Sequence, residues 1–400
     1  MKVLTLTPYL PFPPSSGGQI RSYNLIKQLY KKHDITLFCY IRDDKEREFI
    51  PELEKYCKKV VVFKRRKAWN PFNIILSGLT LYPFLVSIYL SRTFRDAVAR
   101  ELDEENYDLI HAETFYVMTN IPKTSLPTIL VEQTIEYLVY QHFVKGVKFI
   151  PLRFLLNLDV AKLKFWERDF WKKAGKVVAV SEADRREMLS LEKGLDVDLV
   201  PNGVDLNFFL PKKNWDEKDK RVLFVSNFKW LQNVEAAQAL VNDVFPKIKE
   251  KVPGVKLWIV GQHTPESVTS LAADDIIIKS LQEDDVESIR SAYNKASVFV
   301  APLKGPGGTR LKNLAAMASK LPIVTTKIGA QGIGVADGVD VYIRDTASDM
   351  ANAVVELLRS PEKAKVLAEN ARRLVERKYS WDKMGEKLDK VYREAVLGAK

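Results

Sequence analysis

The residues with the clearest chemical potential lie in one short stretch, 301–312, with the sequence APLKGPGGTRLK. It follows an apolar run and precedes a helical pattern over 313–319. A glycine-rich loop, the N–H groups of a helix start and two or three cations would therefore converge on one point. That arrangement suits a diphosphate, whose charge Arg310 and Lys312 would neutralise, the arginine with bidentate geometry. The alternative is a basic turn that only caps a helix.

A second glycine turn, PPSSGG at 13–18, follows the first apolar run and leads into a helical pattern. The N–H groups of Gly17 and Gly18 would lie at a helix N-terminus, a favourable place for an anionic group. Paired glycines allow close backbone approach to a ligand, although such turns also occur without ligands. No GK[ST] sequence follows a glycine loop and no GxGxxG follows the first apolar run, which excludes an ATPase P-loop and weighs against a nicotinamide enzyme.

Short apolar runs that recur along the chain must position these turns, with amphipathic stretches between them that suit helices. Such runs predict parallel strands buried on both faces, and the β-then-α rhythm predicts a doubly wound α/β fold. In the first half the runs are residues 3–6, 35–39, 60–63, 109–111, 128–131 and 177–180. In the second half they are residues 222–225, 256–260, 276–278, 298–301, 323–325 and 341–343.

The strand rhythm restarts after residues 201–205 and a polar stretch, 211–220, that has the composition of a connecting loop. A chain of 400 residues suffices for two or three domains of roughly 100 to 200 residues each. We expect one Rossmann-like domain over 1–205, a second over 206–379, and a final helical segment, 380–400, that packs back on the first domain.

The composition is that of an ordinary folded protein, with 46% hydrophobic and 28% charged residues. A net charge of +11 attracts phosphates, nucleic acid or anionic lipid surfaces, but no RNA- or DNA-binding motif accompanies it, so we expect no nucleic acid partner. Cys39 and Cys57 form no CxxC pair, which makes a disulfide scaffold or a structural zinc site improbable. The first residues contain four prolines and no signal peptide, so we expect a cytoplasmic protein.

One segment departs from the strand rhythm, because residues 68–91 contain no charged side chain. Their length would satisfy a membrane-spanning helix, but prolines and polar residues weaken that interpretation. Basic residues flank this segment at 64–67, Arg92 and Arg95. They favour contact of residues 64–95 with an anionic membrane surface, and the alternative is ordinary buried or acceptor-side structure. Residues 145–171 mix aromatic with basic side chains and are a second candidate surface, or helices that pack on the first domain's core.

Seven pieces of sequence, in this order and spacing, resemble the family 4 glycosyltransferases, which are retaining enzymes with the GT-B fold that use nucleotide-sugars. The resemblance covers nearly the whole chain. The pieces are the first strand with its SSGG turn, residues 178–184, 201–205, 222–233, 258–261, the GGTRLK loop and residues 380–382. The resemblance implies two Rossmann-like doubly wound parallel-sheet domains that face each other across a cleft. The acceptor would bind to the first domain and the nucleotide-sugar to the second.

The resemblance also implies roles for individual residues. Arg310 and Lys312 would hold the donor diphosphate and act in catalysis, while the N–H groups of the Gly17–Gly18 turn would touch phosphate and sugar. The donor-binding positions are Gly17, Gly18, Asn233, Gly261, Gly307, Gly308, Thr309, Arg310, Leu311, Lys312 and Ala315. No metal or other cofactor is implied, because cationic side chains and helix N-termini stabilise the departing nucleoside diphosphate.

The chain departs from the family pattern where two glutamates normally stand. Gly307 occupies the first position and Ala315 the second, whose carboxylate hydrogen-bonds the nucleotide ribose. A charged hydrogen bond contributes roughly 1.5 to 3 kcal/mol, so donor affinity is expected to fall about tenfold to a hundredfold. Reduced, altered or abolished transferase activity therefore stays open.

Three further residues match histidine- or carboxylate-bearing positions of the family. His111 and Glu113 end an apolar run two residues apart, so strand alternation puts both on the same side. They are candidate catalytic residues, with a strand-end structural role as the alternative. Glu136 either faces the acceptor or only begins a helix.

Together these features predict a retaining, metal-independent hexosyltransferase that transfers a sugar to a glycan or lipid-linked acceptor in polysaccharide biosynthesis, peripheral on the inner face of the plasma membrane. A non-catalytic GT-B binding or scaffold protein and a GT-B sugar-nucleotide epimerase are the alternatives. Donor sugar, nucleobase, linkage and oligomeric state are not specified by the sequence.

Overall fold

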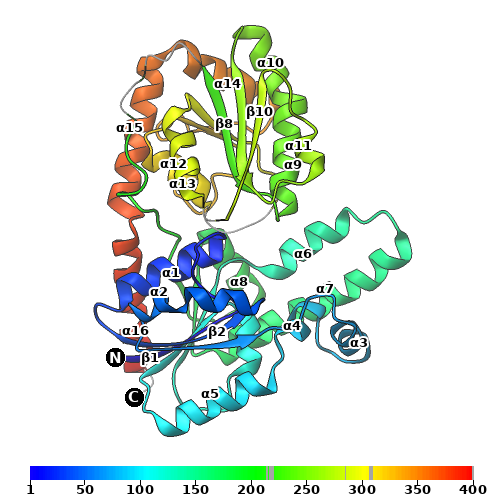
Figure 1. Ribbon diagram of the computed structural model, residues 1–400, viewed down its shortest axis with the longest axis vertical. Helices are drawn as coiled ribbons and strands as arrows, with labels where there is room; N and C mark the ends of the chain where they lie inside the picture. Colours follow the sequence, from blue (N-terminus) through cyan, green and yellow to red (C-terminus); the bar gives the residue numbers. More distant parts are fainter. Residues whose placement is uncertain (213–214, 216–219, 284, 306–309, 399–400) are drawn as a thin grey trace. The chain divides into compact units, whose positions relative to one another are not determined.

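The computed structural model describes residues 1–212, 215, 220–283, 285–305 and 310–398 (Figure 1). The chain forms two compact units, one of Met1–Pro201 with Met384–Lys400 and the other of Asn202–Lys383. The N-terminal unit thus ends four residues before the boundary expected at 205, and the last helix belongs to it.

The N-terminal unit is built on a seven-stranded parallel sheet of strand order β3-β2-β1-β4-β5-β6-β7. Its central strands are almost wholly buried, which explains their uninterrupted apolar sequences. The strands are β1 (Lys2–Thr7), β2 (Asp34–Ile41), β3 (Lys59–Lys64), β4 (Leu109–Glu113), β5 (Thr128–Glu132), β6 (Lys176–Ala179) and β7 (Val197–Leu199). The six strands expected in this half are confirmed, whereas the three-residue β7 was not anticipated.

Helices connect these strands in the β-then-α order. They are α1 (Gly17–Leu29), α2 (Ile50–Glu54), α3 (Pro71–Leu79), α4 (Phe84–Tyr89), α5 (Arg92–Glu104), α6 (Glu136–Lys145), α7 (Ile150–Lys173) and α8 (Glu182–Leu191). Short 3₁₀ turns occupy Asp44–Phe49 and Phe115–Asn120. Among the described residues, no helix combines the length and apolar character that a membrane span needs.

The last helix, α16 (Trp381–Gly398), runs from the end of the C-terminal unit into the N-terminal unit. It lies against α1, where an added Cβ at Gly385 would be only 2.5 Å from the Cβ of Gln28 (Figure 1). Asp389 binds His33 at 2.8 Å, and Glu394 forms an ion pair with Lys176 at 3.2 Å. The first and last segments of the chain therefore belong to one core.

The C-terminal unit repeats the same plan with a six-stranded parallel sheet of order β10-β9-β8-β11-β12-β13. Its strands are β8 (Arg221–Asn227), β9 (Lys256–Gln262), β10 (Ile276–Leu281), β11 (Val298–Ala301), β12 (Ile323–Thr325) and β13 (Tyr342–Ile343), all six of them expected. Its helices are α9 (Leu231–Ala239), α10 (Phe245–Lys251), α11 (Glu266–Thr269), α12 (Val286–Lys295), α13 (Leu311–Ala318), α14 (Ala347–Arg359) and α15 (Pro361–Lys378), with a π-helical turn at Leu240–Val244.

Helices α6 and α7 form a hairpin that projects from the N-terminal sheet (Figure 1). Packing on the core is confirmed for part of residues 145–171, and contact with a surface stays a prediction for the rest. Phe170 and Trp171 are buried in the core, whereas Phe149, Phe154 and Phe165 are exposed. Aromatic content alone does not separate these two cases.

Candidate functional site

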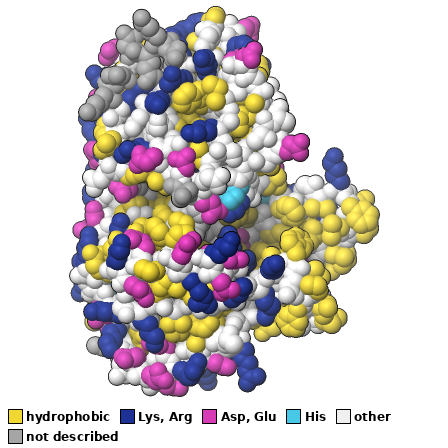
Figure 2. Space-filling view, in the orientation of Figure 1, with side chains coloured by type: hydrophobic (Ala, Val, Ile, Leu, Met, Phe, Trp, Pro, Cys, Tyr) yellow, Lys and Arg dark blue, Asp and Glu magenta, His cyan; other side chains and the backbone are white. Residues whose placement is uncertain are grey.

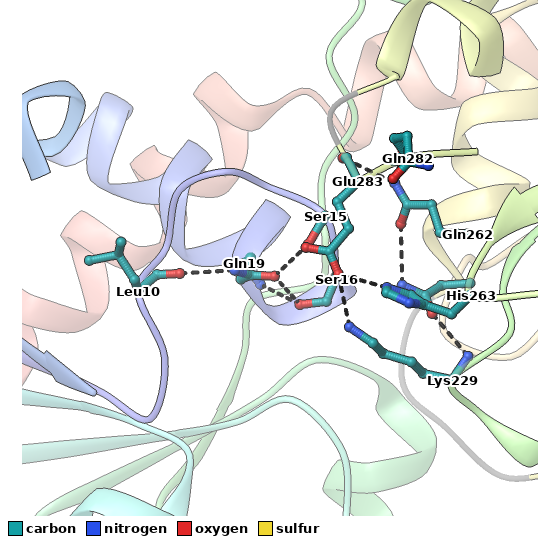
Figure 3. Close-up of polar contacts among 10 residues, drawn as sticks. Leu10, Ser15, Ser16, Gln19, Lys229, Gln262, His263, Gln282 and Glu283 are labelled. Carbon is teal, nitrogen blue, oxygen red and sulfur yellow. Dashed lines mark hydrogen bonds and ion pairs between the residues drawn. The ribbon is translucent and has the colours of Figure 1, made fainter. Parts of the chain in front are cut away.

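Each unit carries polar residues at the carboxyl edge of its own sheet, and the two sets are built differently. In the N-terminal unit the chain leaves β1 and enters α1 at Gly17, with Ser16 as the N-cap. The hydroxyls of Ser15 and Ser16 donate to Oε1 of Gln19 at 3.0 and 2.8 Å, and Nε2 of Gln19 donates to the carbonyl of Leu10 at 3.0 Å (Figure 3). These bonds fix the turn that carries the glycines.

Gly18 has a steric reason to be glycine within its own unit. A Cβ there would lie 2.5 Å from Oε1 of Gln133 and 2.6 Å from the hydroxyl of Tyr9. No larger residue fits while these side chains keep their places. The donor-binding role assigned to the Gly17–Gly18 turn stays a prediction, because close packing already accounts for Gly18.

His111 and Glu113 lie on the same side of β4, as strand alternation predicts, and they contact each other. Nε2 of His111 is 2.8 Å from Oε2 of Glu113, and the Tyr392 hydroxyl lies 2.6 Å from Nδ1 of the same ring. A neutral imidazole with its proton on Nε2 satisfies both contacts. Both ring nitrogens are therefore occupied, which favours a structural role for His111.

Glu113 is the centre of this buried network. Its Oε1 accepts from Nε2 of Gln133 at 2.6 Å and lies 3.5 Å from Nε of Arg21. Burial pushes the pKa of the Glu113 carboxyl up, but the bond with His111 and the charge of Arg21 bring it below its usual value. Arg21 also donates to the carbonyl of Pro201 at 2.9 Å. The carboxylate thus has its opposite charge inside the unit.

Glu136 belongs to a different set of contacts. It is the first residue of α6, and its backbone N–H donates to Oε1 of Glu167 at 2.7 Å. Burial raises the pKa of its side chain to about 7, against a hydrogen bond with Tyr116 that lowers it. Glu136 therefore does begin a helix, and contact with an acceptor stays a prediction.

The C-terminal unit places Arg310 and Lys312 at the start of α13, after β11. Arg310 is the N-cap residue and donates through Nη2 to the carbonyl of Gly305 at 2.6 Å. Gly307, Gly308 and Thr309, which were expected to touch the donor, lie outside the described residues. Leu311, a further expected donor-binding residue, is half-buried as the first residue of the helix.

Lys312 points to the carboxyl end of β8. Its ammonium donates to Oγ of Ser226 and to Oδ1 of Asn233, both at 2.7 Å. Asn233 is held by a bond from Nδ2 to the carbonyl of Asn227 at 2.6 Å. Both acceptors of the lysine are neutral. Burial and, secondly, the charge of Arg310 hold the pKa of Lys312 well below its usual value.

Gly261 brings β9 close to this lysine site. It pairs with Ser226 across the two strands, and a Cβ at Gly261 would lie 1.9 Å from the Ser226 carbonyl oxygen. Only glycine permits this approach. The expected residues Asn233, Gly261 and Lys312 are thus brought together, whereas Ser226 was missed. Its position at a strand's carboxyl end was the available signal.

Ala315 lies on the next turn of α13 and is 5% exposed within the C-terminal core. The turn that follows Lys312 therefore carries a methyl group and no carboxylate. The side chain at position 315 therefore supplies no negative charge to balance Arg310 and Lys312.

A second polar cluster of the C-terminal unit was missed by the sequence interpretation. Oε1 of Glu283 lies 2.7 Å from Nε2 of His263 and 3.0 Å from the ammonium of Lys229, and Nε2 of Gln262 donates to the Glu283 carbonyl at 3.1 Å (Figure 3). These residues follow the carboxyl ends of β8, β9 and β10. Strands that are neighbours in the sheet bring such residues together although they are far apart in sequence.

Comparison with known proteins finds one matching family model in each half of the chain. Residues 15–208 match the family described as Glycosyltransferase Family 4, and residues 219–360 match Glycosyl transferases group 1. A protein of Klebsiella pneumoniae, described as an uncharacterized 44.6 kDa protein in the cps region, is 22% identical over 396 residues, 96% of this chain and 97% of that protein.

Two further relatives are described with an activity or a ligand. A phosphatidyl-myo-inositol mannosyltransferase of Mycobacterium tuberculosis is 28% identical over 238 residues, and this match spans 56% of this chain and 60% of the enzyme. The crystal structure of the Anabaena protein HepE in complex with UDP-glucose superposes with a TM-score of 0.63 at 16% identity, covering 98% of this chain and 100% of HepE. That likeness concerns the fold, which is GT-B.

Proposed function

Because the chain belongs to the family 4 glycosyltransferases and has the GT-B fold, we propose that it transfers a hexose-type sugar from a nucleotide-sugar with retention of configuration and without a metal. The glycosyltransferase activity is that of the family. The observation that carries the finer proposal is Lys312, a half-buried side chain with two neutral hydrogen-bond acceptors and Arg310 as a cation nearby.

An anion completes this site. Among the described residues the Lys312 ammonium has no carboxylate partner, and a diphosphate would supply negative charge together with several acceptor oxygens. The start of α13 adds N–H groups and a favourable dipole for the same anion. The UDP-glucose bound to the structural relative HepE supports a nucleotide-sugar as the source of that diphosphate.

The chemistry follows from stabilisation of the leaving group. The bond between the sugar's anomeric carbon and the diphosphate oxygen breaks, and the acceptor oxygen attacks from the same face to form the new glycosidic bond. The acceptor's proton passes to a phosphate oxygen of the leaving group. Arg310, Lys312 and the helix start would stabilise the developing negative charge, which is the part usually given to a metal ion.

For the N-terminal unit we propose acceptor-side roles that its own contacts support. The amides at the start of α1, in the Gly17–Gly18 turn, are placed for an anionic group or a sugar hydroxyl. His111 and Glu113 act as positioning residues, because they contact each other and buried neighbours. Glu136, whose pKa of about 7 allows either protonation state near neutral pH, is the proposed contact to the acceptor.

We further propose that the acceptor is a glycan or a lipid-linked carrier used in polysaccharide biosynthesis, and that residues 64–95 contact the anionic inner face of the plasma membrane. Exposed apolar side chains in this segment support the contact, Trp69 and Leu79 foremost. The name of the mannosyltransferase relative, which acts on a phosphatidyl-inositol, supports an amphiphilic acceptor.

Ala315 favours a second candidate, a GT-B protein that binds sugar nucleotides weakly or binds glycans without transfer. Its methyl group cannot replace a ribose-binding carboxylate. Release of nucleoside diphosphate from a panel of UDP-, GDP- and ADP-sugars, with and without acceptors, separates the two. Turnover supports transfer, whereas absence of binding to every member of the panel would refute the donor proposal.

The same assay tests the mechanism. Arg310→Ala should weaken donor binding about tenfold or more, while the exposed control Lys327→Ala should not. Activity should persist in a chelator, and the anomeric configuration of the product, read by NMR, should equal that of the donor. Loss of activity in the chelator would refute the metal-free mechanism, and inverted product would refute retention.

A further inference from the structure

Two stretches of the N-terminal unit contain no acidic residue at all. Residues 55–95 carry nine lysines and arginines without one aspartate or glutamate, and residues 137–158 carry Lys145, Lys148 and Arg153 likewise. Lys55, Lys58, Lys59 and Lys64 pair with acidic residues outside the first stretch. The excess of positive charge therefore comes from the other cations of the two stretches, such as Lys67, Lys145 and Lys148.

The same stretches hold most of the large apolar side chains that the N-terminal unit exposes. The exposed fractions reach 83% for Leu79, 80% for Trp69 and 77% for Ile150. The set comprises Trp69, Phe72, Ile74, Ile75, Leu79, Leu81, Phe143, Phe149, Ile150, Leu152, Phe154, Leu155 and Leu158. Figure 2 shows apolar side chains gathered over the projecting arm of the N-terminal unit. A patch of this extent on a folded protein marks a site of interaction.

Buried polar contacts join the two stretches into one surface. Oδ1 of Asp159, on α7, accepts from the hydroxyl of Ser77 on α3 and from the N–H of Phe84 on α4, both at 3.0 Å. The ammonium of Lys162 donates to the carbonyls of Ser77 and Thr80 at 2.7 and 2.8 Å. Helix α3 is thereby fixed to the base of the α6–α7 hairpin.

Aromatic contacts extend the same junction. The indole N–H of Trp166 on α7 donates to the carbonyl of Leu81 at 2.8 Å, and its ring stacks on Tyr82 at a centroid distance of 4.9 Å. The segment that follows α3 is therefore packed directly against α7.

We propose that the tip of the α6–α7 hairpin, residues 143–158, inserts into an anionic lipid bilayer and, with α3, forms one membrane-docking face. This inference deepens the proposed contact of residues 64–95 by adding a second, more prominent element, and it does not depend on the transfer chemistry. Phe149, Ile150, Phe154 and Leu155 would enter the boundary between headgroups and acyl chains, while Lys145, Lys148 and Arg153 would reach lipid phosphates.

Charge favours a membrane over a second copy of the chain. In a symmetric dimer the same patch faces itself, so the cations of both copies would be brought together without acidic partners. An anionic bilayer instead supplies negative charge and an apolar interior in the same plane. The arrangement fits a surface-bound protein.

A hollow at the edge of this face is placed for a lipid headgroup. It has a volume of about 480 Å³, and its lining includes Arg66, Arg92 and Arg95 beside Phe72, with one carboxylate, Asp96. Arg66 is fixed by Nε donating to Oδ1 of Asn73 at 2.9 Å, and Asp96 lies 3.6 Å from Nε of Arg92. Three arginines against one carboxylate leave a net positive charge for a lipid phosphate.

Flotation of the full chain with vesicles tests the proposal. The probes are vesicles of phosphatidylcholine alone and vesicles with an equal amount of phosphatidylglycerol. Phe149→Ser combined with Phe154→Ser should lower the partition coefficient on the mixed vesicles at least about tenfold, because two large apolar groups no longer enter the lipid. The matched control, Val339→Ser combined with Val366→Ser, changes two exposed apolar residues of the C-terminal unit and should float like wild type.

A charge pair of variants tests the phosphate contacts. Lys145→Glu combined with Lys148→Glu should abolish the preference for phosphatidylglycerol, whereas Lys365→Glu, an exposed lysine of α15, should keep it. Glycerol phosphate and inorganic phosphate at the same concentrations should not displace the bound chain if the bilayer itself is the ligand. Displacement by either one would instead assign the arginines to a soluble phosphate.

Four results would overturn the proposal. These are wild type that does not float on mixed vesicles at low salt, hairpin variants that float like wild type, displacement by the soluble phosphates, and a wild-type dimer in solution that the Phe149→Ser variant dissociates without any vesicle binding. Each variant's thermal unfolding and nucleotide binding should match those of wild type. Loss of vesicle binding with normal nucleotide binding then concerns the membrane proposal alone and not the donor site.

Discussion

The cluster around Glu113 in the N-terminal unit and the cluster around Lys312 in the C-terminal unit differ in how their charge is balanced. In the N-terminal unit Glu113 has Arg21, Gln133 and His111 as partners, so the charge of its carboxylate is balanced inside the protein. In the C-terminal unit Lys312 is held by two neutral oxygens, and its pKa is depressed. The first cluster is complete without a ligand, whereas the second gains most from an anion. The comparison therefore predicts that the Glu113 cluster stabilises the fold and that the Lys312 cluster binds the anion.

The largest expected effect lies in the N-terminal cluster. Glu113→Ala leaves Arg21 buried without its carboxylate and should lower the free energy of unfolding of this unit by about 3 to 5 kcal/mol. Chemical denaturation of the full chain measures it. The control is Glu105→Ala, which removes an exposed ion pair with Lys2 and should cost at most about 1 kcal/mol. Equal effects of both variants would contradict the internal balance described for Glu113.

Lys312→Met should produce the opposite pattern. It keeps an apolar chain of similar length and removes a desolvated charge, so the ligand-free protein should be as stable as wild type or more stable. Nucleoside diphosphate affinity should fall about tenfold to a hundredfold, because a charged hydrogen bond contributes roughly 1.5 to 3 kcal/mol. Calorimetric titration measures the nucleoside diphosphate affinity of this variant and of the control Lys327→Met. Unchanged affinity for Lys312→Met would exclude the lysine from the phosphate site.

Proton uptake gives a third test of the contrast. The pKa of Lys312 is lowered in the free protein, and a bound diphosphate would raise it, so binding takes up a proton at pH values between the two. Affinity should therefore fall as pH rises through that interval, by at most about tenfold per pH unit.

The measurement is calorimetry in buffers of different ionisation enthalpy, above the phosphate's own pKa of about 6. Lys312→Met should bind without this proton uptake. Wild type that binds without taking up a proton would show that the ammonium is already charged before the ligand arrives.

The smallest expected effect comes from Ala315→Glu. The new carboxylate lies one turn after Lys312, where it supplies part of the missing negative charge and makes the two clusters more alike. It should reduce the proton uptake and, if the ribose lies over this turn, raise nucleoside diphosphate affinity by up to about tenfold. Ala315→Gln is the control for size. Unchanged affinity in Ala315→Glu would indicate a different ribose pocket.

The strands were predictable because parallel strands that are buried on both faces have continuous apolar sequences. All twelve expected runs are strands. The three-residue β7 was too short for such a signal. Arg310 and Lys312 were identified because glycine, helix start and cations stand together in sequence. Asn233 and Gly261 required the resemblance.

The partners of these residues were not predictable in the same way. Ser226 meets Lys312 across 86 positions, and Tyr392 meets His111 across 281. No local pattern marks such pairs, because only the folded sheet brings them together. The exposure of the hairpin's aromatic side chains was not predictable for another reason. The same residue type, phenylalanine, occurs at exposed and at buried positions, and only the structure shows that Phe149 is exposed and Phe170 is buried.

The place of α16 in the N-terminal unit has a consequence for synthesis of the chain. Asp389 and Tyr392 complete the surroundings of His33 and His111, yet the ribosome adds them after the whole C-terminal unit. The N-terminal unit therefore cannot form its contacts with α16 until this last helix has been synthesised. Synthesis of the N-terminal sheet and completion of its packing are thus separated by synthesis of the whole C-terminal unit.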